Sequence, residues 1–168
     1  MDIRAVLKSQ YHAALKTLRM DIEQCPDGMW AEPTDGPAPF WRVAYHTLFY
    51  AHFYSLQDAG QFKPWAKNWR GAETLEGIAS ECPEAPQPFS PYSRAEVLEY
   101  WRLCDDRIDA AIETLDLEAP RCGFPWYTMG TLEHQLVNIR HIQHHAAILS
   151  ARLRNVAGIS IGWVGMTK

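Results

Sequence analysis

The sequence has no basic cluster and no long apolar run, and each absence excludes a class of partner. Lys and Arg number 16 against 20 Asp and Glu, which gives a net charge of −4. Proteins that bind nucleic acid or anionic membranes present clustered positive charge, so we expect neither partner. No segment approaches the roughly 18 to 20 apolar residues of a membrane-spanning helix, and the first residues lack the apolar stretch of a signal peptide. We therefore expect a cytoplasmic protein.

The sequence also lacks closely spaced cysteine pairs. Its four cysteines are Cys25, Cys82, Cys104 and Cys122. Zinc knuckles and thioredoxin-like redox sites need Cys-x-x-Cys pairs, so both are excluded, and we expect reduced, structural thiols. Glycine-rich phosphate loops, dinucleotide fingerprints and Ser/His/Asp arrangements are missing as well.

What the sequence has is the composition of a globular protein. Its 168 residues are 47% hydrophobic, 21% charged and 12% aromatic, far from the composition of disordered chains. A chain of this length normally forms one domain. We expect a single domain over 1–168.

Four segments have the apolar spacing of amphipathic helices. We expect these helices over about 2–24, 40–58, 94–115 and 131–154. Ser93 and Glu96 form a capping-box pattern at the start of the third helix, and Thr131 is placed to cap the fourth. Long connections rich in proline and glycine separate the helices, and no alternating segment indicates a sheet. The predicted fold is all-α, a four-helix bundle with long crossover connections.

The last predicted helix carries a polar stripe on its core-facing side. His134, Asn138, His141 and His145 recur at spacings of four, three and four residues, which places them on one helical face. A buried polar group without a partner costs about 1–3 kcal/mol. These side chains therefore need something to bind.

His46 poses the same problem on the second predicted helix, where it shares its face with apolar and aromatic residues. Two histidines at i and i+4, such as His141 and His145, can bind one metal ion, and a histidine from a facing helix can complete the set. Three protein ligands leave a coordination position for water or substrate, as in catalytic sites. We predict that His46, His141 and His145 bind one divalent ion. The alternative for His46 alone is a hydrogen-bonded core histidine.

The other histidines are weaker candidates. His144 lies on the flank of the stripe and is a less favoured ligand. His134 is about 10 Å from His141 along the axis, so it either lines the pocket or makes a core hydrogen bond. His12 and His52 are expected at the surface or rim of the bundle.

The histidine-bearing faces of the two helices carry no carboxylate that could act as a general base, so no catalytic residue is assigned. Asn138, Tyr50 and His134 are candidate pocket residues, although a core aromatic is the favoured interpretation of Tyr50. Aromatic residues in the long connections can either cover the pocket or anchor the connections to the bundle. They are Trp65, Trp69, Trp126 and Tyr127.

Two segments resemble the DinB/YfiT-like family, many of whose members have no known activity. The first is Val-Ala-Tyr-His-Thr-Leu-Phe-Tyr over 43–50, and the second is Asn-Ile-Arg-His-Ile-Gln-His-His over 138–145. The resemblance implies a four-helix bundle in which His46, His141 and His145 hold a divalent ion such as zinc or nickel. It also implies a homodimer and a small-molecule substrate.

The resemblance also implies the chemistry of the characterised branches of that family, which is transfer of a low-molecular-weight thiol to an electrophile, or hydrolysis. One departure matters: members often continue the last histidine with Arg-Gly-Gln, whereas Ala146, Ala147 and Ile148 follow His145 here. Our leading hypothesis is a metal-dependent enzyme, thiol S-transferase-like or hydrolase-like. The alternative is a non-catalytic, metal-stabilised bundle that binds a small ligand or partner.

Overall fold

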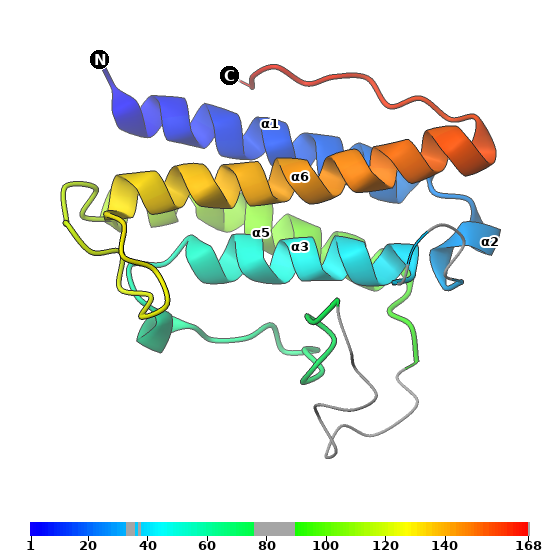
Figure 1. The fold of residues 1–168 in the computed structure, drawn as a ribbon, viewed down its shortest axis with the longest axis horizontal. Coiled ribbons are helices and arrows are strands. Elements are labelled where there is room, and N and C mark those ends of the chain that lie inside the picture. Colours follow the sequence, from blue (N-terminus) through cyan, green and yellow to red (C-terminus); the bar gives the residue numbers. More distant parts are fainter. Residues whose placement is uncertain (33–35, 37, 76–89, 168) are drawn as a thin grey trace.

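The structure is a computed structural model that describes residues 1–32, 36, 38–75 and 90–167, and this part of the chain is helical without any strand (Figure 1). The long helices are α1 (Ile3–Gln24), α3 (Phe40–Tyr54), α5 (Arg94–Thr114) and α6 (Thr131–Ala157). Two short elements join them, α2 (Asp27–Trp30) and the 3₁₀ helix η1 (Ala59–Gln61). The all-α prediction is confirmed.

The four long helices pack around one apolar core. Both α1 and α3 pack against α6 and also against α5, and Figure 1 shows α6 lying between α1 and α3. Each long helix contributes fully buried apolar side chains to this core, including Leu7, Leu15, Leu18, Leu48, Ile108, Ile112, Ile142 and Leu149. Burial of such side chains stabilises the fold by about 1.5–3 kcal/mol each.

Helix α3 ends at Tyr54, four residues before the end expected from the sequence. The Ser55 hydroxyl donates to the carbonyl of His52 at 2.7 Å, and the Asp58 carboxylate accepts from the backbone N–H of Gly60 at 2.8 Å. Short polar side chains of this kind compete with helical backbone hydrogen bonds. The chain therefore turns away from the bundle axis early and forms η1.

The predicted capping box of α5 is confirmed, because Ser93 and Glu96 make both reciprocal hydrogen bonds. The predicted cap of α6 is wrong. Gly130 is the N-cap, while Thr131 is buried and its hydroxyl accepts a hydrogen bond from the Gln57 amide at 3.1 Å. At its other end, α6 runs three residues beyond the expected 154 and ends at Ala157. The C-cap is Gly158, whose φ of 69° favours glycine.

The connection between α3 and α5 is anchored by aromatic rings. Trp65 is buried and stacks on Tyr100 of α5 with ring centroids 4.9 Å apart. Tyr92 stacks on Tyr45 of α3 at 4.7 Å. Trp65 therefore anchors this connection, the second of the two roles considered for it. Cys82 and the prolines at 83, 86 and 88 lie outside the described residues, whereas Cys25, Cys104 and Cys122 are buried free thiols.

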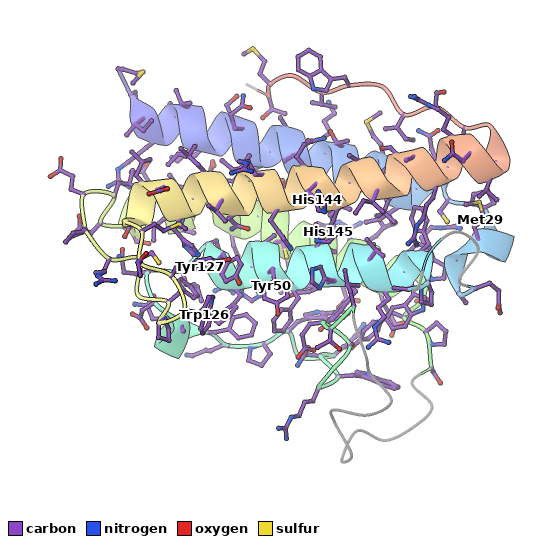
Figure 2. All side chains as sticks on the ribbon, viewed as in Figure 1. Met29, Tyr50, Trp126, Tyr127, His144 and His145 are labelled. Carbon is purple, nitrogen blue, oxygen red and sulfur yellow. The ribbon has the colours of Figure 1, made fainter. Side chains whose placement is uncertain are left out.

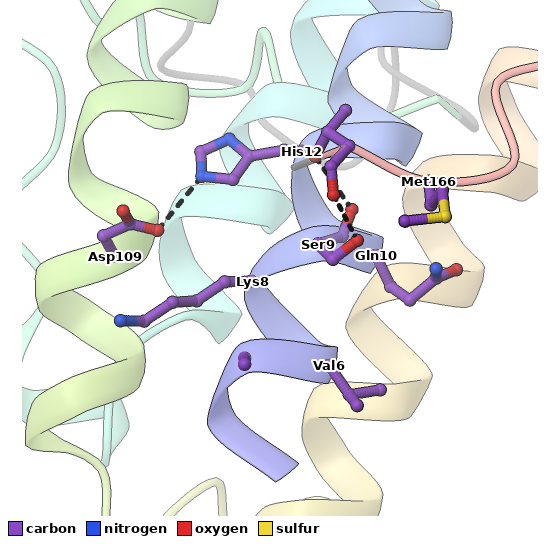
Figure 3. A pocket seen from close by; sticks show the side chains of 9 residues that line it. Val6, Lys8, Ser9, Gln10, His12, Asp109 and Met166 are labelled. Carbon is purple, nitrogen blue, oxygen red and sulfur yellow. Dashed lines mark hydrogen bonds and ion pairs between the residues drawn. The ribbon is translucent and has the colours of Figure 1, made fainter. Parts of the chain in front are cut away.

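The C-terminal segment after α6 returns along α1 toward the N-terminus (Figure 1). The Ser9 hydroxyl donates to the carbonyl of Thr167 at 2.7 Å, and the Gln10 amide donates to that of Gly165 at 3.2 Å. Met166 lies beside these α1 residues (Figure 3) and is 65% exposed. The expected homodimer stays a prediction. In the described segments, every helix is too short or too polar to cross a bilayer.

Asp21 places an ionisable group inside the contact between α1 and α6. Its side chain is fully buried, and one carboxylate oxygen accepts from the Ser150 hydroxyl at 2.6 Å. The other oxygen has no hydrogen-bond partner among the described residues. Burial therefore raises the pKa of Asp21 to about 7.

This raised pKa predicts a pH-dependent difference in stability between the wild type and Asp21→Asn. The folded chain holds the Asp21 proton up to about pH 7, whereas the unfolded chain releases it near pH 4, so the wild type loses stability as the pH rises between these values. We expect Asp21→Asn to gain about 2–4 kcal/mol relative to the wild type over this range, with no further gain above it. Urea unfolding at pH 4.5, 6 and 7.5 measures the difference. Asp106→Asn, at an exposed position of α5, is the control, and an Asp21→Asn difference that is equal at all three pH values contradicts the prediction.

Candidate metal centre

Three histidines from two helices meet at the contact between α3 and α6. One ring nitrogen each from His46, His141 and His145 lies within 4.8 Å of the other two. The Nε2 atoms of His46 and His141 are 3.2 Å apart. His145 is buried, and the other two rings are half-buried. The structure thus brings together the three residues that the sequence nominated.

Buried amides fix the position of α6 along α3. The Asn138 amide donates to the carbonyl of Ala51 at 3.1 Å, and the Gln135 amide donates to that of Tyr54 at 3.0 Å. These carbonyls lie in the last turn of α3, where no further helical N–H is present to bind them. Because both amides lie within two turns before His141, their hydrogen bonds set this ring opposite His46.

The orientation of His46 is set from outside the two helices. Its Nδ1 lies 2.5 Å from the backbone carbonyl of Glu73. A carbonyl oxygen can only accept, so Nδ1 carries the proton and Nε2 presents its lone pair toward His141. Metal-binding histidines are commonly oriented in this way by a hydrogen bond at the other ring nitrogen.

Segment 71–74 is held against α3 by a second residue. Arg42, one helical turn before His46, donates to the carbonyls of Gly71 and Thr74 at 2.7 and 2.8 Å. Arg42 and His46 therefore hold this short segment between them. The sequence did not indicate a role for Glu73, because this residue contributes its backbone carbonyl and a pattern of side chains does not predict such a contact.

The histidine cluster is electrically neutral at neutral pH. Burial, followed by the charge of neighbouring histidines, lowers the pKa of His141 to about 4 and that of His145 to about 3. Burial also lowers the pKa of His46. Imidazole must be neutral to bind a metal ion, so all three rings are in the binding form.

The donor set fits a divalent ion. In tetrahedral coordination, bonds of about 2.0–2.1 Å place two nitrogen ligands about 3.3 Å apart, close to the 3.2 Å between the two Nε2 atoms. The Nδ1 atoms of His141 and His145 are buried without a hydrogen-bond partner among the described residues. Neutral imidazoles suit zinc and nickel alike. That these three residues bind a metal stays a prediction.

Tyr50 and His144 border the cluster as expected. The Tyr50 ring centroid is 4.8 Å from that of His46 and 5.6 Å from that of His141, and burial raises the pKa of its hydroxyl. His144 is exposed, and its ring centroid is 5.0 Å from that of His145. His144 is not part of the group whose nitrogen atoms converge. Figure 2 shows His145 between α6 and α3, with Tyr50 on α3 nearby.

Two other members of the polar stripe are core residues. Asn138 is fully buried and serves the helix contact described above rather than a pocket. His134 is also fully buried, with ring centroids 4.6 Å from Phe124 and 4.9 Å from Tyr54. Neither of its nitrogen atoms has a hydrogen-bond partner in the described part of the chain, so the core hydrogen bond, one of the two roles considered for His134, is not seen.

The expectation of a surface position is wrong for His52. This side chain is 4% exposed, and its Nδ1 lies 3.2 Å from the hydroxyl of Tyr100, because this side of α3 packs against α5. His12 is half-buried between Asp105 and Asp109 of α5, at 2.7 and 3.1 Å. These two histidines join helices, and neither reaches the cluster.

One residue of the candidate centre, His141, lines a hollow of about 540 Å³ along one side of α6. Its lining consists of Val137, Arg140, His141, Gln143, His144 and Ala147. A second hollow, of about 580 Å³, lies between α1, α5 and the C-terminal segment (Figure 3) and contains none of the three clustered histidines.

Residues 10–149 match the family model described as the DinB superfamily. The matched range covers most of the chain and includes all three histidines of the cluster. The chain belongs to the DinB superfamily. Comparisons with curated proteins and with solved structures gave no match. Membership of the DinB superfamily and the three-histidine cluster together fit a metal-binding protein.

Metal binding by the three histidines of this DinB superfamily protein can be tested directly. Purified without chelators, the chain should bind about one zinc or nickel ion, and His141→Ala and His145→Ala should each lower the affinity by about 100-fold or more, since outer-shell losses alone cost 10–100-fold. Metal analysis and competition with a chelating dye measure this. Equal metal affinity in the wild type and in His46→Ala, His141→Ala and His145→Ala would refute the ligand assignment.

The lowered pKa values also fix the pH range over which protons compete with the metal. Since the pKa of His141 is about 4 and that of His145 about 3, binding should persist at pH 5.5, where free imidazole with a pKa of about 6.5 is largely protonated. The affinity should then fall as the pH approaches 4. Circular dichroism at each pH controls for unfolding.

Proposed function

We propose that this DinB superfamily protein is a metal-dependent enzyme acting on small molecules, either by transferring a low-molecular-weight thiol to an electrophile or by hydrolysis. The observation that carries the proposal is a set of three converging histidines, one of which, His141, lines an open hollow. Three ligands leave a coordination position free, which is typical of catalytic rather than structural sites. A divalent ion in such a site supplies Lewis acidity and lowers the pKa of a bound water or thiol.

The residues around the cluster support chemistry at neutral pH. The Glu73 carbonyl keeps the His46 Nε2 lone pair directed at the centre. The aromatic ring of Tyr50 lies beside two of the three histidine rings, and the raised pKa of its hydroxyl keeps this group protonated at neutral pH. Tyr50 can therefore donate a hydrogen bond to an anionic group of a bound ligand. The half-buried rings of Phe49 and Phe53 pack against the ring of Tyr50. These rings limit the access of water to this side of the cluster.

The alternative is a non-catalytic bundle in which the metal is structural and a fourth protein ligand closes the site. His144 is the nearest further donor on α6, and its ring would have to turn from solvent toward the centre. Its exposed position favours the open site. The resembling family often has Arg and Gln where this chain has Ala146 and Ile148, so these two positions supply no further ligand.

Comparison of two neighbouring variants distinguishes the open from the closed site. With an open site, added zinc should raise the melting temperature of His144→Ala as much as that of the wild type, because only the folded state binds the ion tightly. His145→Ala should lose this zinc-dependent increase. Equal losses in the two variants would indicate a closed, structural site. Differential scanning calorimetry with and without zinc provides the measurement.

Activity itself is tested with a small panel of reactions. Zinc- or nickel-loaded protein is assayed for transfer of cysteine or glutathione to a chlorinated aromatic electrophile, and for hydrolysis of activated esters and amides. We expect at least one reaction that His141→Ala abolishes, that His144→Ala retains, and that a chelator stops reversibly. Metal-loaded wild type that is inactive throughout a broad panel, despite confirmed binding, would favour the non-catalytic alternative.

A further inference from the structure

The hollow beside His141 differs chemically from three other hollows of the described surface. Each of these three is lined by at least one carboxylate: Asp109 in the first, Glu23 and Asp105 in the second, and Asp116 in the third. The lining beside His141 contains no Asp or Glu, although the chain has a net charge of −4. It contains the guanidinium of Arg140 instead.

Arg140 makes no hydrogen bond or ion pair within the described part of the chain. It lies on the hollow together with His144, one helical turn further along, and with the Gln143 amide. The helical rise places Arg140 and His144 about 6 Å apart along the axis. Val137 and Ala147 supply the apolar part of the lining. An arrangement of one unpaired guanidinium, a few polar side chains and small apolar residues is typical of a small-molecule site.

We propose that this hollow binds a small molecule that carries one carboxylate group, with the carboxylate on Arg140 and the rest of the molecule reaching toward His141. The planar guanidinium can donate two parallel hydrogen bonds to a carboxylate. The proposal rests on the proposed function, because it assigns a substrate class to the same metal centre.

A single negative charge fits the hollow better than a polyphosphate. The lining has one guanidinium and no lysine. Phosphate groups are commonly bound at helix N-termini, where free backbone N–H groups are available. The hollow spans positions 137–147 in the middle of α6, where the backbone N–H groups are already used within the helix. One Arg therefore has to provide the anion binding.

The experiment uses two thiols that differ in one group. 3-Mercaptopropionate carries a carboxylate where 3-mercapto-1-propanol carries a hydroxyl, and both present the same thiol. Calorimetric titration of each into zinc-loaded wild type should show a preference of about tenfold for the carboxylate, in the range of a charge-assisted hydrogen bond. Arg140→Gln should abolish the preference while leaving metal content and the affinity for the alcohol unchanged.

Arg102→Gln is the control, because Arg102 is an exposed residue of α5 that does not line the hollow and its replacement changes the net charge equally. The control should keep the preference. A preference that persists in Arg140→Gln would mean that the carboxylate binds the metal itself, and this would overturn the proposal. Equal affinity of the wild type for the two thiols would overturn it as well.

A second measurement separates failure of this proposal from failure of the proposed function. Propionate, which has no thiol, is titrated into metal-free wild type and metal-free Arg140→Gln, and backbone amide signals are followed by NMR. We expect shifts confined to residues 137–147 of the wild type and none in the variant. Such shifts in a protein that binds no zinc would refute the metal-dependent enzyme and retain the carboxylate site. Zinc binding without any propionate shift would refute the carboxylate site and retain the metal-dependent enzyme.

Discussion

The contact between α3 and α6 is the constraint on which the candidate centre depends. Two buried amides, those of Gln135 and Asn138, bind backbone carbonyls in the last turn of α3. A slip of α6 by one residue would rotate its face by about 100° and would leave these amides and carbonyls unpaired in the core, at about 1–3 kcal/mol for each group. The hydrogen bonds thus hold His141 and His145 opposite His46 with a precision that apolar packing alone does not provide.

Most of the helices and the histidine cluster could be predicted because both depend on local periodicity. Apolar spacing places α1, α5 and α6 within a few residues of their ends, and the i, i+4 spacing of His141 and His145 puts both on one face. The end of α3 was missed because Ser55 and Asp58 bind nearby backbone groups, and such bonds do not affect apolar periodicity. The burial of His52 was missed because it depends on which side of α3 meets α5, and a helix read alone does not reveal its neighbours.

Several polar groups are buried in this bundle without full hydrogen bonding. Besides the histidine cluster, they include one oxygen of Asp21 and both nitrogen atoms of His134. Each such group lowers the stability that the apolar core provides. A bound ion would satisfy the cluster alone, since His134 lies two helical turns from His141. The fold therefore tolerates polar burial beyond what a metal explains, and the structure offers no account of His134.

The hydrogen bond from His46 to the Glu73 carbonyl makes a loop backbone part of the metal centre. Arg42 holds the same segment through the carbonyls of Gly71 and Thr74. If the three histidines hold a metal ion, thermodynamic linkage requires that any change that displaces this segment weakens metal retention, and that metal binding in turn favours the docked segment. A natural variant at position 42 or within 71–74 would then appear as a metal-deficient protein although every ligand is intact. Surveys that score variants only by their distance from the histidines would class such a residue as structural.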